Sequence, residues 1–239
     1  MHILGKYLVE THAHTSEISP CATCPAQLFG ELFAQHGYST VILTNHLCRA
    51  VYDKKGFTSW NSYIDSFVEG FRLAEKAAAG RFTVLMGAEI NFTGAPNDYL
   101  AYGITEEFML KHPDFTESSP KEFYPLAKEN GILLIQAHPF RFGTRIINPD
   151  YLDGYEIYNG NPRHNSNNDI AAAWASKHGK PATAGTDFHE PGDIGLCGME
   201  FDLPIASVDD FIHAILSGSG KAHEPQGLMH DARCIMHNE

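Results

Sequence analysis

The chain has 239 residues, of which 43% are hydrophobic and 19% are charged. It can therefore bury a sizeable core, and its composition excludes a long disordered or coiled-coil protein. Asp and Glu number 29 against 17 Lys and Arg, a formal net charge of −12, which disfavours sequence-independent binding to nucleic-acid backbones and anionic membranes. No apolar run approaches the ~20 residues of a membrane span, and the N-terminal residues lack a secretory pattern, so we expect a cytoplasmic protein.

Strand-like and helix-like segments alternate along the chain. Short apolar, β-branched runs predict strands over residues 7–9, 40–43, 82–86, 99–102, 132–135, 155–158 and 181–184. Helical spacing of apolar residues predicts helices over residues 25–35, 63–79, 119–131, 169–178 and 207–217, the last with a capping-box pattern. Such alternation predicts parallel strands joined by right-handed crossovers. We therefore expect an α/β fold with a closed or nearly closed barrel, and an open doubly wound sheet is the alternative.

Histidines and carboxylates stand at the ends of most predicted strands. They occur in Glu10-Thr-His12-Ala-His14-Thr-Ser-Glu17, Thr44-Asn-His46, Gly87-Ala-Glu89, Gln136-Ala-His138-Pro139 and Gly185-Thr-Asp187-Phe-His189, and in Asn97-Asp98 just before the fourth strand. In an extended His-x-His or Asp-x-His segment both side chains point the same way. Imidazole and carboxylate are the ligands of Zn, Mn and Fe(II). A lone histidine at a strand end is usually a surface or capping residue, but this many at successive ends predict a multinuclear metal site.

These motifs resemble those of the PHP family, the polymerase and histidinol phosphatase domain, in order and in spacing. The family signature is a His-x-His start, a Thr-x-His, an Ala-His-Pro and a Gly-Ser-Asp-x-His. Each motif alone is weak, but all of them occur here in order from residue 10 to about 190, with Glu89 between the second and third. The resemblance implies a distorted seven-stranded, TIM-like β/α barrel. It also implies a single catalytic domain over 1–239, with a C-terminal strand, helix and tail over 191–239.

The resemblance further implies three divalent metal ions. The first would be held by His12, His14, Glu89 and Asp187. Glu89 would bridge to the second, which His138 completes, and the third would be held by His46 and His189.

Two ligand positions depart from the commonest pattern of the family. Asp98 stands where members often have a histidine, and Glu17 is the candidate where the first loop often supplies His or Asp. Carboxylate oxygen suits Mn and Fe as well as Zn, so the metal is left open. Glu10 replaces the usual Asp before the first histidine, and we interpret it as a partner that orients a ligating imidazole.

The expected site carries positive charge despite the acidic chain. Its four carboxylates meet three divalent ions, so a net charge of about plus two favours an anionic substrate, with phosphate the obvious one. Metals ~3.5–4 Å apart can bridge a hydroxide that attacks in line. We expect Arg141 and Arg163 to bind the phosphate, against the alternative of solvated ion pairs. The general acid is left open among Asp187, His189, His164 and a metal-bound water.

The cysteines indicate no disulfide framework, since the five are odd in number and scattered. Cys21-Ala-Thr-Cys24 resembles a redox or zinc pair, but Cys48, Cys197 and Cys234 show no zinc-ribbon spacing with it. We interpret the pair as part of a loop near the first metal loop, with metal ligation or sensitivity to oxidation as the alternatives.

The sequence therefore predicts a metal-dependent phosphatase that acts on a small phosphomonoester, without nucleic-acid or membrane partners. One alternative is an amidohydrolase-like hydrolase acting on a carbon centre, against which the arginine loops argue. The other is a non-catalytic module stabilised by metal, against which the complete ligand set argues. The substrate, the metal and the oligomeric state are left open.

Overall fold

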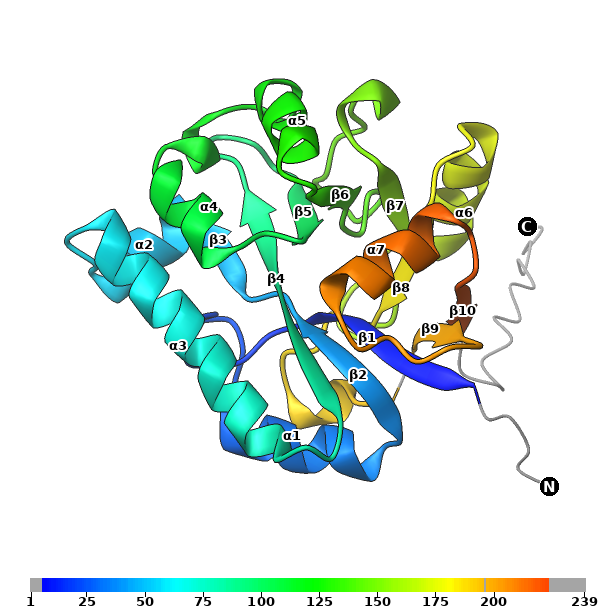
Figure 1. Cartoon of the computed structure of the whole chain (residues 1–239). Helices are drawn as coiled ribbons and strands as arrows, with labels where there is room; N and C mark the ends of the chain where they lie inside the picture. The colour runs from blue at the N-terminus through cyan, green and yellow to red at the C-terminus, as the bar shows by residue number, and fades with distance from the viewer. Residues whose placement is uncertain (1–5, 196, 224–239) are drawn as a thin grey trace, which may run out of the picture.

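A curved mixed sheet organises the chain, and a computed structural model describes it over residues 6–195 and 197–223 (Figure 1). The strand order is β10-β9-β1-β2-β4-β5-β6-β7-β8, with β3 paired to β4. The bounds are β1 Tyr7–Ala13, β2 Tyr38–Leu43, β3 His46–Cys48, β4 Thr83–Asn91, β5 Asp98–Tyr102, β6 Leu133–Gln136, β7 Gly154–Asn159, β8 Ala182–Gly185, β9 Gly198–Phe201 and β10 Lys221–His223.

The sheet nearly closes on itself where β1 meets the segment after β8. The backbone N–H of His14 donates to the carbonyl of Phe188 over 2.8 Å, and the N–H of Phe188 donates to the carbonyl of His12 over 3.1 Å. The hydroxyl of Thr11 adds a bond of 2.9 Å to the carbonyl of Ala184. This closure brings the two ends of the motif series together, and the expected distorted barrel is confirmed.

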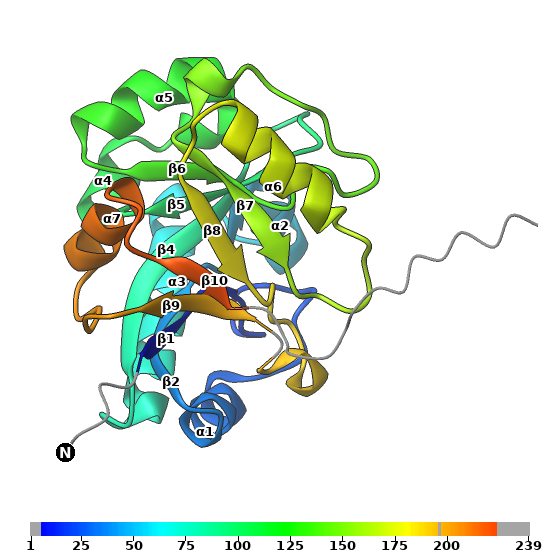
Figure 2. The ribbon, with the colours of Figure 1, turned by 90° about the vertical axis from the view of Figure 1, so that its right-hand side faces the viewer.

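Helices cover the outside of the sheet (Figures 1 and 2). Their bounds are α1 Ala26–Gln35, α2 Arg49–Lys55, α3 Trp60–Ala78, α4 Glu106–Lys111, α5 Pro120–Glu129, α6 Asn168–Lys177 and α7 Val208–Leu216, with single 3-10 turns at Phe115–Glu117, Pro149–Tyr151 and Pro191–Asp193. The predicted helices are all present, and the capping box at Ser207 and Asp210 forms as expected. The sequence prediction missed the short α2 and α4.

Helices α1 and α3 pack against each other beside β2 and β4. A Cβ on Gly30 would lie 2.6 Å from the backbone of Ala77, so glycine is what lets the two helices approach. Phe29 and Phe33 on α1 are fully buried, next to Phe188. Burying each ring stabilises the fold by about 2 kcal/mol relative to exposure, and it anchors the segment that carries Asp187 and His189.

The expectation of uniformly parallel strands is wrong at β5. This strand runs antiparallel to both β4 and β6. Only residues 92–97 separate β4 from β5, too few for the dozen or so residues of a parallel crossover, so the connection is a hairpin. The reversal puts the first residue of β5, Asp98, at the end of the barrel where its parallel neighbours finish.

The opposite end of the barrel is covered by α7. Phe211 packs edge-on against Tyr102 at 4.7 Å between ring centres, and Ile212 approaches Gly103 just beyond β5. The C-terminal segment, for which one strand was expected, forms two strands, β9 and β10, which extend the sheet beyond β1 as antiparallel partners. None of the helices in the described ranges is long and apolar enough to cross a bilayer.

Candidate metal centre

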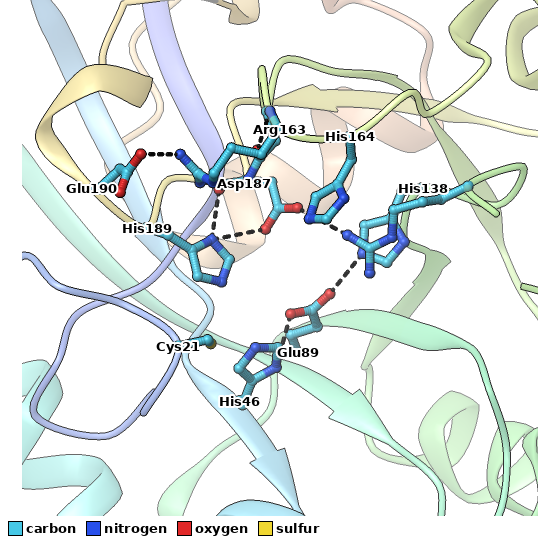
Figure 3. A pocket seen from close by; sticks show the side chains of 11 residues that line it. Cys21, His46, Glu89, His138, Arg163, His164, Asp187, His189 and Glu190 are labelled. Atoms are coloured by element: carbon cyan, nitrogen blue, oxygen red, sulfur yellow. Dashed lines mark hydrogen bonds and ion pairs between the residues drawn. The ribbon is translucent and has the colours of Figure 1, made fainter. Parts of the chain in front are cut away.

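A cavity of about 340 Å³ opens at the end of the barrel where β4, β6 and β8 finish and β5 begins (Figure 3). Its walls carry a mixture of imidazole, carboxylate, guanidinium and thiol groups. The lining residues are Cys21, His46, Glu89, His138, Arg141, Asn161, Arg163, His164, Asp187, His189 and Glu190.

The predicted histidines and carboxylates converge beneath and around this cavity. In the described part of the chain, three groups have donor atoms within 4.8 Å of one another, a spacing that can hold a cation. They are His12–His14–Asp187, His12–Glu89–His138 and His14–His46–His189. Because neighbouring groups share His12 or His14, the arrangement is one continuous cluster built from five separate segments of the chain.

Several donor atoms in the cluster lack a hydrogen-bond partner in the structure although they are buried. These are Nε2 of His12, Nε2 of His14 and Oε2 of Glu89. Leaving such an atom unsatisfied costs about 1–3 kcal/mol. Nε2 of His12 lies 3.3 Å from both Oε1 of Glu89 and Oδ1 of Asp187. Ligands each about 2.1 Å from a tetrahedral zinc lie ~3.4 Å apart, so the atoms fit a divalent cation.

A buried carboxylate that sequence reasoning missed orients the ligand histidines. Glu156, in the middle of β7, lies 2.9 Å from Nδ1 of His12 and accepts the backbone N–H of His138 over 2.8 Å. Such partners fix the tautomer and direction of a metal-binding imidazole. The signal in the sequence was a lone glutamate in an otherwise apolar and aromatic strand, Tyr155-Glu156-Ile157.

The role expected of Glu10 is corrected by the same contacts. Its carboxylate accepts from the backbone N–H groups of Thr11, His12 and Thr186, and from the hydroxyl of Thr186. It therefore ties β1 to the loop after β8 and does not orient an imidazole, because both of its oxygens are engaged by these backbone and hydroxyl groups.

Two residues of the cluster have strained backbones. Asp187 and His138 have φ of 50° and 28°, in the left-handed region that non-glycine residues rarely adopt. Side chains from the end of β7 and the loop after it hold Asp187 in place: Nδ2 of Asn161 donates to its carbonyl over 3.1 Å, and Nδ2 of Asn159 donates to its Oδ2 over 3.3 Å. Strain of this kind costs about 1–3 kcal/mol and persists where the surroundings fix it.

The carboxylates and the histidines of the cluster shift one another's pKa values in opposite directions. Burial acts to raise the pKa of Glu89 and Asp187, but the neighbouring histidines outweigh it and hold both well below the usual range. Conversely, burial acts to lower the pKa of His12, which the carboxylates raise well above its usual value. Burial and two neighbouring imidazoles lower the pKa of His14 to about 4. His14 is thus a neutral donor near pH 7.

Asp98 and Glu17, the two carboxylates that depart from the commonest ligand pattern, differ in their positions. Asp98 joins the cluster: its Oδ2 lies 3.8 Å from Nε2 of His138, and burial followed by the nearby Glu89 raises its pKa. Glu17 is not brought together with the histidines. Its Oε1 accepts the backbone N–H of Ala26 over 2.8 Å, and so it caps the first turn of α1, which has no other side-chain cap.

The two arginines also differ. Arg141 lies across the cavity and makes long contacts of 3.5 Å to both Asp98 and Asp187, at the weak end of hydrogen-bond distances, so an anion can compete for its guanidinium. Arg163 is already engaged: it binds both oxygens of the buried Asp193 at 2.5 and 2.8 Å, and Glu190 at 2.6 Å. The expected phosphate clamp at Arg163 is therefore replaced by an ion pair that braces the loop after β8.

The remaining predicted residues line the cavity. His164 is exposed at the mouth, where partial burial and then Arg141 lower its pKa. Nδ1 of His189 lies 2.8 Å from the carbonyl of Asp187. Cys21 lies beside the rings of His46 and His189 (Figure 3). Burial acts to raise the pKa of this thiol, but interactions with those two imidazoles lower it to about 6. Cys234 lies outside the described residues, and the four described cysteines are free thiols.

Comparison with known proteins places the fold among PHP proteins. The family model described as PHP-associated matches residues 165–219. PsfC from Pseudomonas syringae is similar over 93% of each chain, with a TM-score of 0.69 and 16% identity. A two-domain protein from Bacteroides vulgatus, containing a predicted PHP-like metal-dependent phosphoesterase, has a TM-score of 0.67 and 16% identity over 92% of this chain. No curated protein matches the sequence.

A third similar structure is Endonuclease Q, in complex with a 27-mer duplex substrate that has an abasic lesion at the active site. Its TM-score is 0.62 at 15% identity, over 92% of this chain. This chain spans only 65% of the Bacteroides chain and 58% of Endonuclease Q. The comparisons confirm the resemblance to PHP proteins and the barrel fold.

One expectation is overturned by this comparison. We had excluded binding to nucleic-acid backbones from the net charge of −12, yet Endonuclease Q, which is similar in fold over 58% of its chain, forms a complex with a duplex DNA substrate. Net charge is an average over the whole surface, whereas a phosphate is bound by the few cations around it. The exclusion therefore does not hold.

Proposed function

We propose that this chain, a PHP protein by its fold and its PHP-associated segment, is a metal-dependent phosphoesterase that hydrolyses a small phosphomonoester. The observation that carries the proposal is the convergence of unpartnered buried donors, Nε2 of His12 and His14 with Oε2 of Glu89, below an open cavity that Arg141 crosses. A cluster of this composition at the barrel end is suited to cations, and a guanidinium beside it is suited to an anionic substrate.

We further propose three divalent cations, one for each group of donors, with Zn, Mn and Fe as candidates. The first group is His12, His14 and Asp187, with Glu89 shared with the second. The second is Glu89 with His138 and Asp98, and the third is His46 with His189, which lie next to His14. When bound, such cations activate water and neutralise charge on a phosphoryl group.

The protein's own side chains have three tasks in this proposal. Glu156 holds the imidazole of His12 in the orientation that presents Nε2 to the cavity. Arg141 binds a non-bridging oxygen of the phosphate, because its fork lacks a close carboxylate partner. His164 contacts the leaving group, since it lines the cavity and lies outside the groups that fit a cation.

The size of the cavity supports a small substrate. Its volume of about 340 Å³ lies near the lower end of the ~300–1,000 Å³ range of small-molecule sites. It accommodates a phosphate with one modest organic group. A polymer would have to lie across the mouth with only one phosphate inside, so duplex DNA is tested as an alternative outcome.

The test is phosphate release from a panel of phosphomonoesters, diesters and abasic duplex DNA. The protein is stripped with a chelator and refilled with Zn, Mn or Fe, and His112→Ala serves as a control histidine variant outside the cavity. Release from monoesters that depends on metal and is inhibited by inorganic phosphate supports the proposal. Cleavage of DNA alone would contradict the monoester assignment. Hydrolysis of amides without phosphate release would favour the carbon-centre alternative.

A further inference from the structure

We propose that a second cavity, beside α2 and apart from the metal centre, binds a small organic cation, a protonated amine on a compact apolar body. The cavity is lined by Arg49 and Tyr52 of α2, by Trp60 at the start of α3, by Thr93 after β4 and by four residues of the segment 113–117. Its volume of about 370 Å³ is close to that of the catalytic cavity, with which it shares no lining residue. The inference is therefore independent of the proposed phosphoesterase activity.

The walls of this second cavity are held together by hydrogen bonds within the chain. The backbone N–H of Thr93 donates to the carbonyl of Thr116 over 2.8 Å, and the hydroxyl of Thr93 donates to Oε1 of Glu117 over 3.1 Å. The indole N–H of Trp60 donates to the carbonyl of Met109 over 2.7 Å and so ties α3 to α4. The cavity is therefore preformed, as small-molecule sites usually are.

Trp60 supplies an aromatic surface that suits a cation. Its single donor, the indole N–H, is engaged by Met109, so this partly exposed side chain offers the cavity only its ring. Indole attracts cations more strongly than the other aromatic side chains do. A contact of the same kind is already present on the neighbouring wall, where the guanidinium of Arg49 lies 4.9 Å from the centre of the Tyr52 ring.

Two carboxylates at the second cavity lack a cationic partner. Asp114 and Glu117 line it, and neither forms an ion pair within residues 6–195 and 197–223. Arg49, the cationic side chain of the lining, is already paired with Asp53 at 2.9 Å. The cavity therefore has an excess of negative charge, which favours a cationic ligand over a second phosphate.

A buried hydroxyl is the independent indication of a polar ligand. Thr116 is only 2% exposed and lines the second cavity. Its carbonyl accepts from Thr93, but its hydroxyl has no hydrogen-bond partner among the described residues. Buried polar groups are normally hydrogen-bonded, and the oxygen of Thr116 can accept from a ligand N–H. A protonated amine is the group that suits this hydroxyl, the two carboxylates and the indole ring together.

Binding of benzylamine tests the inference. The full chain is treated with a chelator, so that the amine cannot ligate a metal ion, and binding is followed by saturation-transfer NMR at millimolar concentrations of the probe. Benzylamine should bind saturably and at least about tenfold more tightly than benzyl alcohol, whereas benzoate should not bind. Absence of saturable binding of benzylamine overturns the proposal. Equal affinity for benzyl alcohol overturns the assignment to a cation.

Matched variants identify where the probe binds. The double variant Asp114→Asn, Glu117→Gln and the single variant Thr116→Val should each weaken benzylamine binding about tenfold. Glu75→Gln, which alters an exposed glutamate of α3 outside the cavity, should leave it unchanged. Circular dichroism checks that each variant is folded. Unchanged affinity in the folded double variant overturns the site, because benzylamine would then be held elsewhere, such as among the carboxylates of the chelated metal centre. The double variant should also take up metal as wild type does, so this test and that of the phosphoesterase can fail separately.

Discussion

The floor and the rim of the cavity are built differently. The floor is His12, Glu89, His138 and Asp187, which are at most 2% exposed and stand on or directly after β1, β4, β6 and β8. The rim is Cys21, Arg141, Arg163 and His164, which come from loops and are partly or fully open to solvent. Sheet register fixes the floor, whereas side-chain pairing fixes the rim. Changes in the floor should therefore remove the centre, and changes in the rim should adjust what it binds.

The largest effect is expected from Asp187→Asn. Loss of the charge removes a cation ligand and leaves the left-handed backbone and its asparagine contacts in place, so turnover should fall at least about 1,000-fold without unfolding. Phosphate release, metal content and circular dichroism check this. Full turnover with normal metal content would show that the floor is assigned wrongly.

Glu156→Gln should have the next largest effect. An amide of the same shape cannot provide the charged acceptor for Nδ1 of His12, so metal affinity should fall about 10–100-fold. Competition with a fluorescent chelator measures the affinity. Thr183, which lies on β8 but belongs to none of the three groups, supplies the control variant Thr183→Val. An unchanged affinity in Glu156→Gln would remove the orienting role.

Acidification should weaken metal binding. Burial acts to lower the pKa of both His12 and His46, but Asp187, Glu89 and Glu156 raise that of His12 and Glu89 and Cys21 raise that of His46 well above the usual value, so each imidazole holds a proton near pH 7. A cation must displace those protons, and the affinity should therefore fall by about tenfold per pH unit for each proton released. Calorimetry in two buffers of different ionisation enthalpy counts the protons. Zero release at pH 7 would contradict the sign.

Replacement of Arg141 and of Arg163 compares two residues of the rim. Arg141→Ala should raise KM for the phosphomonoester about tenfold or more, because a charge-assisted bond to phosphate is lost. Arg163→Ala should leave KM nearly unchanged and lower the free energy of unfolding by about 1–3 kcal/mol, since buried Asp193 loses its partner. Steady-state kinetics and urea unfolding separate the two. The opposite assignment of effects would mean that Arg163 leaves its ion pair to bind substrate.

The smallest effect is expected from Glu17→Gln. The amide oxygen can still accept the N–H of Ala26, so metal content should stay at the wild-type value and stability should change by less than about 1 kcal/mol. Elemental analysis and thermal unfolding measure both. Loss of one metal from this variant would restore Glu17 as a ligand.

The sequence predicted the floor because the floor is local. Each ligand lies within a few residues of a strand end, so the patterns His12-x-His14 and Asp187-x-His189 already imply two side chains on one side of an extended segment. The barrel then follows from the repeated strand–helix alternation, and its closure brings residues 12 and 187 together. The pattern did not predict the direction of each strand. The hairpin that reverses β5 was indicated only by the short connection over residues 92–97.

Tertiary structure alone decided which groups became partners. Glu156, and not Glu10, orients the imidazole of His12, because β7 directs the carboxylate of Glu156 toward that ring. Arg163 forms an ion pair with Asp193, and Glu17 caps the start of α1. No spacing rule contains these contacts, because they join loops whose paths depend on packing elsewhere. The sequence by itself therefore determined the kinds of ligand and the end of the barrel where they gather, and the fold decided how each carboxylate, guanidinium and thiol is used there.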